Sequence, residues 1–252
     1  MPGSGSWEIV SIRKKRTLVI TCLSSDAMMT AEQVENWARL ELPPGSDRGR
    51  ILGLPWAEAR NAGVRMALEG GYAYLFFLDS DIYPLDKQIV LKLIDTGYPV
   101  ISGLYYQKFH PYFPAAFNMG RDDKGNPVRV PIENFTPGDI VPADFVPAGA
   151  LLVRRDVLEA AWNKFNKRPF IWGLDTSPVP DGLGGNVPNF SEDYVFSFRV
   201  KTYLGIQPHV ATGLPAGHET KAIVVPKWVA PMPDYHPLHG VMTARTDVPL
   251  KG

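Results

Sequence analysis

Residues 72–84 read Tyr-Ala-Tyr-Leu-Phe-Phe-Leu-Asp-Ser-Asp-Ile-Tyr-Pro, an apolar run that ends abruptly in two acidic residues. The run is short and follows a Gly70-Gly71 pair, so it predicts a buried central strand and not a helix. Side chains two apart on an extended strand point the same way, so Asp79 and Asp81 would lie side by side at its carboxyl end. In an open α/β sheet, ligands bind at that edge.

Two neighbouring carboxylates repel each other, and a divalent cation would hold them together. Hard oxygen ligands suit Mg²⁺ or Mn²⁺, and such an ion keeps coordination positions open for substrate phosphates. The alternative interpretation is that Asp79-Ser80-Asp81 is only a polar strand end before a turn.

The bulk composition is typical of a globular protein. The chain has 252 residues, 45% of them hydrophobic, which is enough for one large or two small domains. Its 26 basic and 26 acidic side chains balance, so we expect no nucleic-acid partner. Cys22 is the only cysteine, which excludes an intrachain disulfide and a cysteine-based zinc site. We find no apolar stretch long enough to span a bilayer and no signal core, so we expect a cytoplasmic protein.

Predicted strands and helices alternate along the chain, which favours a mostly parallel α/β sheet flanked by helices. Residues 108–142 break the rhythm because they are rich in Pro, Gly, Asn and charge, and they predict loops with a small antiparallel excursion. The other strands are expected at 17–23, 98–103, 145–153 and 206–211, and the helices at 31–40, 55–69, 84–96, 156–165 and 194–203.

The last predicted helix begins with acidic residues. Ser191 suits the N-cap, and Glu192 and Asp193 suit the first turn because they complement the helix dipole. That is a sufficient structural explanation for both acids. The same position also favours an ionised carboxylate, which a general base requires.

Several loop and strand-end residues could meet a ligand. Ser24 closes the first strand with a small polar group, and Gly149-Ala150 would let a substrate approach the backbone closely. Simple strand packing explains the second feature equally well. Residues 173–190 are rich in Gly and Pro and predict a lid or a surface loop.

For three further polar residues, a purely structural role is the alternative to ligand binding. Arg60 and Asn61 lie in the helix predicted at 55–69, where a surface ion pair and a polar helix face would explain them. His218 follows a Gly/Pro-rich turn predicted at 212–217, and an isolated histidine after a loop is more often incidental than a ligand.

The order of these motifs resembles the GT-A glycosyltransferases, closest to the family 2 group. There, an Arg-Asn helix precedes a strand ending in Asp-x-Asp, and a glycine-containing strand with basic residues, a Glu-Asp helix start and a histidine follow. The order is more specific than any single motif. The matching residues here are Arg60-Asn61, Asp79-Ser80-Asp81, 147–156, Glu192-Asp193 and His218.

The resemblance implies a metal-dependent glycosyltransferase of the hexosyltransferase class with a GT-A fold. Such an enzyme moves a sugar from a UDP- or GDP-linked donor to an acceptor hydroxyl. The resemblance also implies a catalytic domain over residues 17–225, flanked by a flexible arm at 1–16 and a Pro-rich tail at 226–252.

The resemblance also assigns roles to residues. Asp81 would ligate Mn²⁺ or Mg²⁺, with Asp79 on the ribose and the metal and His218 as a further metal or diphosphate ligand. Asp193 would take the proton from the acceptor hydroxyl, which gives inversion, and Arg60 would face phosphate. The remaining expected contacts are Ser24, Ser80 and Asn61 for the nucleotide sugar, and Glu192, Gly149 and Ala150 for the acceptor.

One departure affects the choice of donor. In that family, paired acids precede a Gly-Ser-x-Asp turn after the second strand. The nearest match here is Pro43-Pro44-Gly45-Ser46-Asp47, where prolines replace the acids, so UDP and GDP both stay open.

Three other functions compete with this one. A retaining GT-A transferase would use Asp193 to orient the acceptor, and a degenerate GT-A binding module would have lost the chemistry. A nucleotidyltransferase would need an N-terminal glycine-rich phosphate loop, and residues 21–29 contain no glycine.

Overall fold

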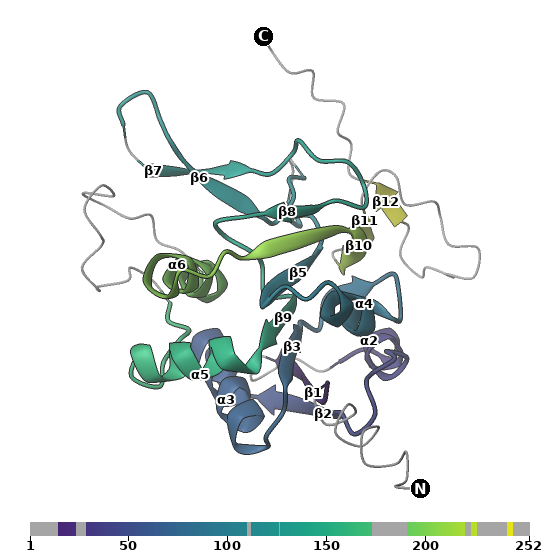
Figure 1. The fold of residues 1–252 in the computed structure, drawn as a ribbon. Helices are drawn as coiled ribbons and strands as arrows, with labels where there is room; N and C mark the ends of the chain where they lie inside the picture. Colours follow the sequence, from purple (N-terminus) through teal and green to yellow (C-terminus); the bar gives the residue numbers. More distant parts are fainter. Residues whose placement is uncertain are drawn as a thin grey trace, which may run out of the picture.

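The computed structural model shows an α/β fold in which helices cover both faces of one large sheet (Figure 1). The residues that it describes are 15–23, 29–109, 112–125, 127–172, 191–219, 223–225 and 241–243.

The sheet is mixed and mostly parallel, as predicted. Its strand order is β12-β11-β10-β5-β9-β3-β1-β2, and β4 and β8 pair with β10 beside that path. β1, β2 and β3 run parallel, β10 begins parallel to β5, and β9 lies antiparallel between β3 and β5. The strands are β1 (Thr17–Leu23), β2 (Asp47–Leu52), β3 (Tyr74–Leu78), β4 (Ile82–Pro84), β5 (Val100–Leu104), β8 (Ile140–Pro142), β9 (Ala150–Arg154), β10 (His209–Glu219), β11 (Ile223–Val225) and β12 (Val241–Thr243).

Alternation along the strands creates a separate apolar core on each face. On β1, Ile20 and Cys22 pack into the core under α3, α5 and α6, whereas Val19 packs into the core under α2 and α4. Figure 1 shows these two groups of helices on opposite sides of β3 and β9. The helices are α2 (Ala31–Ala38), α3 (Trp56–Glu69), α4 (Ile89–Asp95), α5 (Arg155–Lys164) and α6 (Glu192–Leu204).

The antiparallel excursion is present as a separate hairpin. β6 (Phe117–Arg121) pairs with β7 (Pro127–Pro131) in a two-stranded sheet outside the main one. It lies within the irregular stretch that the composition predicted.

The Asp-Ser-Asp segment is not extended, so the prediction that its two carboxylates lie side by side on one strand is wrong. β3 ends at Leu78, and the Ile82 amide donates to the Asp79 carbonyl (3.1 Å), which closes a turn over residues 79–81. The chain then re-enters the sheet as β4, which is why α4 begins at Ile89 and not at residue 84.

The second strand follows the turn at residues 43–47 and does not precede it. Gly45 has a φ of +75°, and the Ser46 amide donates to the Pro43 carbonyl (3.1 Å), so the predicted turn forms. β2 starts directly after it as an edge strand with only Ile51 buried. The match of this turn to the turn after the family's second strand is therefore wrong.

The turn predicted at 212–217 is also wrong, because β10 runs through it. A register shift between Ala211 and Pro215 lets a proline sit in the strand, where a bulge tolerates the missing amide. Beyond the bulge, β10 pairs antiparallel with β4, and His218 lies opposite Ile82.

Several predictions fall outside the described residues, namely Ser24, residues 173–190, and most of the arm at 1–16 and of the tail at 226–252. Among the described residues, no helix is long and apolar enough to cross a membrane.

Candidate active site

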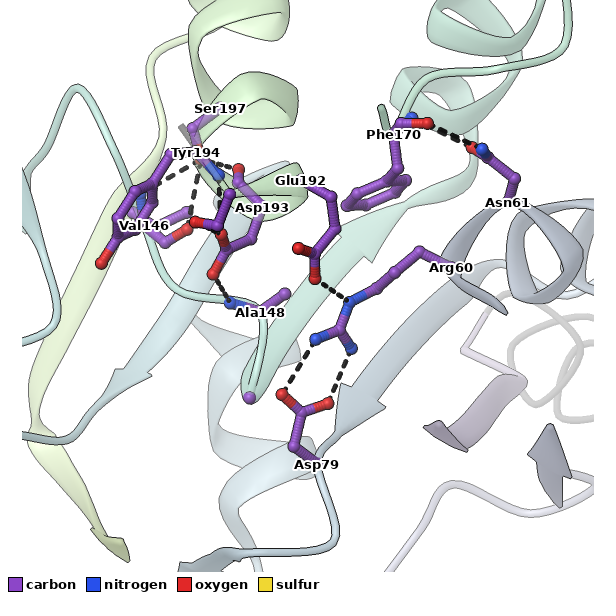
Figure 2. A network of polar contacts seen from close by, with 12 residues as sticks. Arg60, Asn61, Asp79, Val146, Ala148, Phe170, Glu192, Asp193, Tyr194 and Ser197 are labelled. Atoms are coloured by element: carbon purple, nitrogen blue, oxygen red, sulfur yellow. Dashed lines mark hydrogen bonds and ion pairs between the residues drawn. The ribbon is translucent and has the colours of Figure 1, made fainter. Parts of the chain in front are cut away.

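Arg60 lies at the centre of a buried ion-pair network at the end of β3 (Figure 2). Its guanidinium donates from Nη1 to Asp79 Oδ1 (2.8 Å) and from Nη2 to Asp79 Oδ2 (2.9 Å). Its Nε lies 3.4 Å from Glu192 Oε1, and the group stacks over the Phe77 ring at 4.9 Å. The Arg60 side chain is only 2% exposed, and its guanidinium is directed to Asp79 and Glu192, while its predicted nucleotide contact stays a prediction.

The network holds more acid than base. Arg60 is the one cation of this network. The carboxylates of Asp79, Glu192 and Asp193 interact electrostatically with Arg60 or with one another. Burial and then the nearby Asp193 carboxylate raise the pKa of Glu192 to about 7, against the attraction of Arg60. Glu192 therefore changes charge close to neutral pH.

The raised pKa of Glu192 predicts a stability that depends on pH. The folded state holds this proton more tightly than an unfolded chain, whose glutamate titrates near 4.5, so stability falls as pH rises from about 4.5 to about 7. Glu192→Gln removes that loss, so we expect it to gain on the order of 1–3 kcal/mol relative to the native chain between pH 5 and pH 8. Urea unfolding at both pH values measures the gain.

The matched control is Glu159→Gln, which alters an exposed acid on α5. The assigned titration of Glu192 would be contradicted if the difference in unfolding free energy between Glu192→Gln and the native chain were equal at the two pH values.

Asp193 is oriented by three donors at the start of α6. Its Oδ2 accepts from the Ala148 amide (3.2 Å), and its Oδ1 accepts from the Tyr194 amide (2.9 Å) and from the Ser191 hydroxyl. Ser191 is the N-cap, as predicted, although its side chain serves Asp193 and makes no cap hydrogen bond. The two links from Asp193 to Ala148 and Tyr194 are drawn in Figure 2.

This environment suits a carboxylate that accepts a proton. Burial raises the pKa of Asp193, while the hydrogen bonds from Ser191 and the backbone oppose that rise. An ionised carboxylate offers about four acceptor positions, and three of them are used here. Contacts among the described residues leave one acceptor position of Asp193 unused.

Asp81 lies in a second polar cluster, together with a histidine and a lysine. Its Oδ2 contacts the Lys108 ammonium and lies 3.6 Å from His218 Nε2. Burial alone would raise the pKa of Asp81, but His218 and Lys108 lower it to about 2, so the carboxylate is ionised. The Asp81 and Lys108 side chains are about one-third exposed, at 32% and 33%. Solvent and solutes can therefore reach this cluster.

The pairing of β4 with β10 brings His218 to this place. The His218 ring donates from Nδ1 to the Tyr106 carbonyl (2.7 Å), and its Nε2 faces Asp81 Oδ2. A second hydrogen bond of this kind fixes the tautomer of metal-binding histidines.

Asp81 and His218 fit a divalent cation that a substrate would complete. An oxygen and a nitrogen donor 3.6 Å apart can share one ion whose bonds are about 2 Å long. Within the described ranges no group of three or more His, Cys, Asp and Glu side chains could hold a metal. Asp79 faces Arg60 instead, so the described part of the chain offers two ligands at this place, Asp81 and His218.

The remaining predicted residues have structural roles. Asn61 is buried and donates to the Phe170 carbonyl (2.7 Å) while accepting from the Phe170 amide (3.0 Å), and its predicted nucleotide contact stays a prediction. Gly149 and Ala150 are buried, and a Cβ on Gly149 would lie 2.5 Å from the Tyr105 hydroxyl. Both therefore pack against the protein, and their predicted acceptor contact stays a prediction. Ser80 lies half-buried in the turn between the two clusters.

No motif in the sequence indicates the contacts of Lys108 and Tyr105. Lys108 lies in a loop without a motif, and its partner Asp81 is 27 residues away. The Tyr105 hydroxyl accepts from the Gly149 amide (2.9 Å), and its ring packs edge-on against His218. Tyr105 thereby connects the Gly149 turn to the Asp81 cluster.

Of three comparisons with known proteins, the one with solved structures finds matches. No protein-family model matches the chain, and no curated protein matches it either. Among solved structures, A197 from STIV matches with a TM-score of 0.51 at 18% identity, covering 81% of this chain and 86% of that one.

Two other structures match at lower similarity. A 4-diphosphocytidyl-2C-methyl-D-erythritol synthase from Anaerococcus prevotii DSM 20548 has a TM-score of 0.42 at 11% identity, over 80% of this chain and 88% of that one. A mutant UDP-glucose pyrophosphorylase from Leishmania major, in complex with UDP-glucose, has a TM-score of 0.35 at 11% identity, over 75% of this chain and 61% of that one.

The match to A197 and the strand order define the fold class. The chain has the α/β fold of nucleotide-diphospho-sugar transferases, the GT-A-like fold, with a mixed sheet, a small antiparallel hairpin and helices on both faces. At these identities the likeness concerns the fold.

Proposed function

We propose that the protein is a glycosyltransferase that uses a UDP- or GDP-linked sugar and a divalent cation, Mn²⁺ or Mg²⁺, to glycosylate an acceptor hydroxyl. One observation carries the proposal. Arg60 links Asp79, at the end of β3, to Glu192, which directly precedes Asp193 at the start of α6. The buried Arg60 therefore fixes the position of the Asp-Ser-Asp segment, which would meet the donor, relative to Asp193, which would meet the acceptor.

The Asp81 cluster supplies the diphosphate end of the site. Asp81 and His218 would hold the cation, and when bound this ion supplies positive charge to the diphosphate of the leaving nucleotide. Ser80 and Asp81 are partly exposed at the carboxyl end of β3, where ligands bind in open α/β sheets.

Asp193 performs the proton transfer in this proposal. Its free acceptor position takes the proton of the acceptor hydroxyl, the hydroxyl oxygen bonds to the anomeric carbon, and the bond from that carbon to the diphosphate oxygen breaks. The electron pair of that bond leaves with the nucleoside diphosphate. Attack from the side opposite the leaving group inverts the anomeric centre.

A retaining transferase is the second candidate, and the three hydrogen bonds to Asp193 favour it. A carboxylate that already accepts from Ala148, Tyr194 and Ser191 is well suited to orient an acceptor without taking its proton. Analysis of the product anomer distinguishes the two reactions, because only the first inverts the sugar.

Nucleotide binding tests the proposal directly. We expect calorimetric titration to show that UDP or GDP binds in the presence of Mn²⁺, and that Asp81→Asn abolishes the metal-dependent part because the charged oxygen ligand is lost. Asp86→Asn is the matched control, since Asp86 is a nearby acid that pairs with Lys92 on the surface.

Two outcomes would contradict the proposal. A folded native protein that binds neither nucleotide with Mn²⁺ would favour the degenerate binding module. Unchanged Mn²⁺-dependent affinity in Asp81→Asn would remove Asp81 from the metal site.

A further inference from the structure

The Lys108 ammonium contacts the Asp81 oxygen that would be a ligand of a metal ion. It contacts Asp81 Oδ2, the same oxygen that faces His218 Nε2. Because the Nδ1 of that ring is bound to the Tyr106 carbonyl, Nε2 is the nitrogen that remains for a metal. The ammonium and a divalent ion would therefore compete for one oxygen.

The backbone directly before Lys108 is held by hydrogen bonds, whereas the Lys108 side chain is partly exposed and can move. The Gln107 amide donates to the Phe113 carbonyl (2.9 Å), and Tyr106 forms a β-bridge with Pro114. The Lys108 side chain is 33% exposed and has a flexible four-carbon stem. The ammonium can thus leave Asp81 without any change in the sheet.

We propose that Lys108 keeps divalent metal off Asp81 and His218 until the diphosphate of a nucleotide sugar draws the ammonium away. Metal and nucleotide then bind cooperatively, each weakly alone and tightly together. This inference rests on the proposed function, because it takes the diphosphate of that donor as the group that releases Lys108.

Charge balance supports an exchange of partners. With Lys108 on Asp81 the pair is neutral, and a divalent ion entering beside the ammonium would meet a repelling positive charge only a few ångströms away. A diphosphate brings negative charge for both cations, so its arrival removes the repulsion. Linkage then requires that metal raises nucleotide affinity by the same factor as nucleotide raises metal affinity.

Replacing the ammonium by a neutral chain of similar length tests the proposal. We expect Lys108→Met to bind Mn²⁺ about ten-fold more tightly than the native chain in an electron paramagnetic resonance titration without nucleotide, because the competing charge is gone. The factor by which UDP or GDP raises Mn²⁺ affinity should fall toward one. Lys108→Arg keeps the charge and should behave like the native chain.

Two controls locate the effect. Lys92→Met removes another exposed ammonium, one that pairs with Asp86, and should leave Mn²⁺ affinity unchanged. Adding Asp81→Asn to Lys108→Met should abolish the gain, because the shared oxygen is then uncharged.

Native Mn²⁺ affinity in Lys108→Met, or a gain that survives Asp81→Asn, would overturn the proposal. The Mn²⁺ titration without nucleotide separates it from the proposed function. If no variant binds UDP or GDP, the glycosyltransferase assignment and the coupling to diphosphate both fail, while the affinity for Mn²⁺ alone still shows whether Lys108 excludes metal.

Discussion

Replacing Asp193 with asparagine is expected to lower glycosyl transfer by about 10²–10⁴-fold while donor affinity stays within a few-fold of the native value. The amide cannot take the proton of an acceptor hydroxyl. The donor would be bound at the Asp81 cluster, where Asp81 contacts Lys108 and His218, whereas Asp193 contacts Ala148. Single-turnover transfer and calorimetric donor titration measure the two quantities separately.

The hydrogen bonds of Asp193 require a stability control. An asparagine can present its oxygen to the Tyr194 amide, but its amide group then faces the Ala148 amide, donor against donor. We expect a loss of roughly 1–3 kcal/mol, which thermal unfolding detects. Asp156→Asn is the matched variant, because Asp156 is also an acid in the first turn of a helix but lies exposed.

Asp193→Asn with near-native turnover would end its assignment as general base. If turnover falls but the product keeps the donor's anomeric configuration, Asp193 orients the acceptor of a retaining enzyme. If Asp156→Asn loses turnover equally, the effect does not belong to this site.

Replacing Arg60 with methionine is expected to destabilise the fold by about 3–5 kcal/mol, the cost of leaving a buried charge without its partner. Asp79 would lose two hydrogen bonds, and Glu192 would lose its nearest positive charge. Methionine keeps most of the apolar volume over the Phe77 ring, so the loss reports the charge more than the packing. Urea unfolding gives the free-energy difference.

Arg154→Met provides a close comparison. Arg154 makes the same two-pronged contact with Asp156, with both distances 2.7 Å, but on the surface. Exposed ion pairs contribute about 0–1 kcal/mol, so its loss should be small. A second mutation, Asp79→Asn, should restore part of the stability of Arg60→Met, since it removes the unpaired acid. Equal small losses in Arg60→Met and Arg154→Met would show that burial does not set the energy of the Arg60 pair.

Local patterns predicted most of the fold. The apolar strand at 74–78, the helix begun by Pro55 and the helix between Ser191 and Gly205 each follow from residues close together in sequence. Gly205 has a φ of +68°, as expected of a helix-ending glycine. What local patterns could not give was the continuation of β10 through a Gly/Pro-rich stretch, because pairing with β5 and β4 overrides the turn propensity there.

The positions of the acidic residues in the candidate site could be predicted from the sequence, whereas the side chains that contact them could not. Asp79, Asp81, Glu192 and Asp193 stand at strand ends and a helix start, which is why sequence order points to them. The direction of Arg60 depends on which face of α3 meets the sheet, and its partner Asp79 lies across that interface. Asn61 and Lys108 likewise meet residues from other elements, so no spacing in the sequence indicates their contacts.

The contacts that build the site also determine when in folding it can exist. His218 meets the Tyr106 carbonyl across 112 residues, and Asn61 meets Phe170 across 109. Closing such long loops costs chain entropy before the contacts repay it, so folds of this kind form slowly. Because β10 must pair with β5 and β4 before His218 reaches Asp81, a chain ending at α6 would lack the contact between His218 and Asp81. During synthesis, the Asp81 cluster would therefore be complete only after residue 218 has left the ribosome.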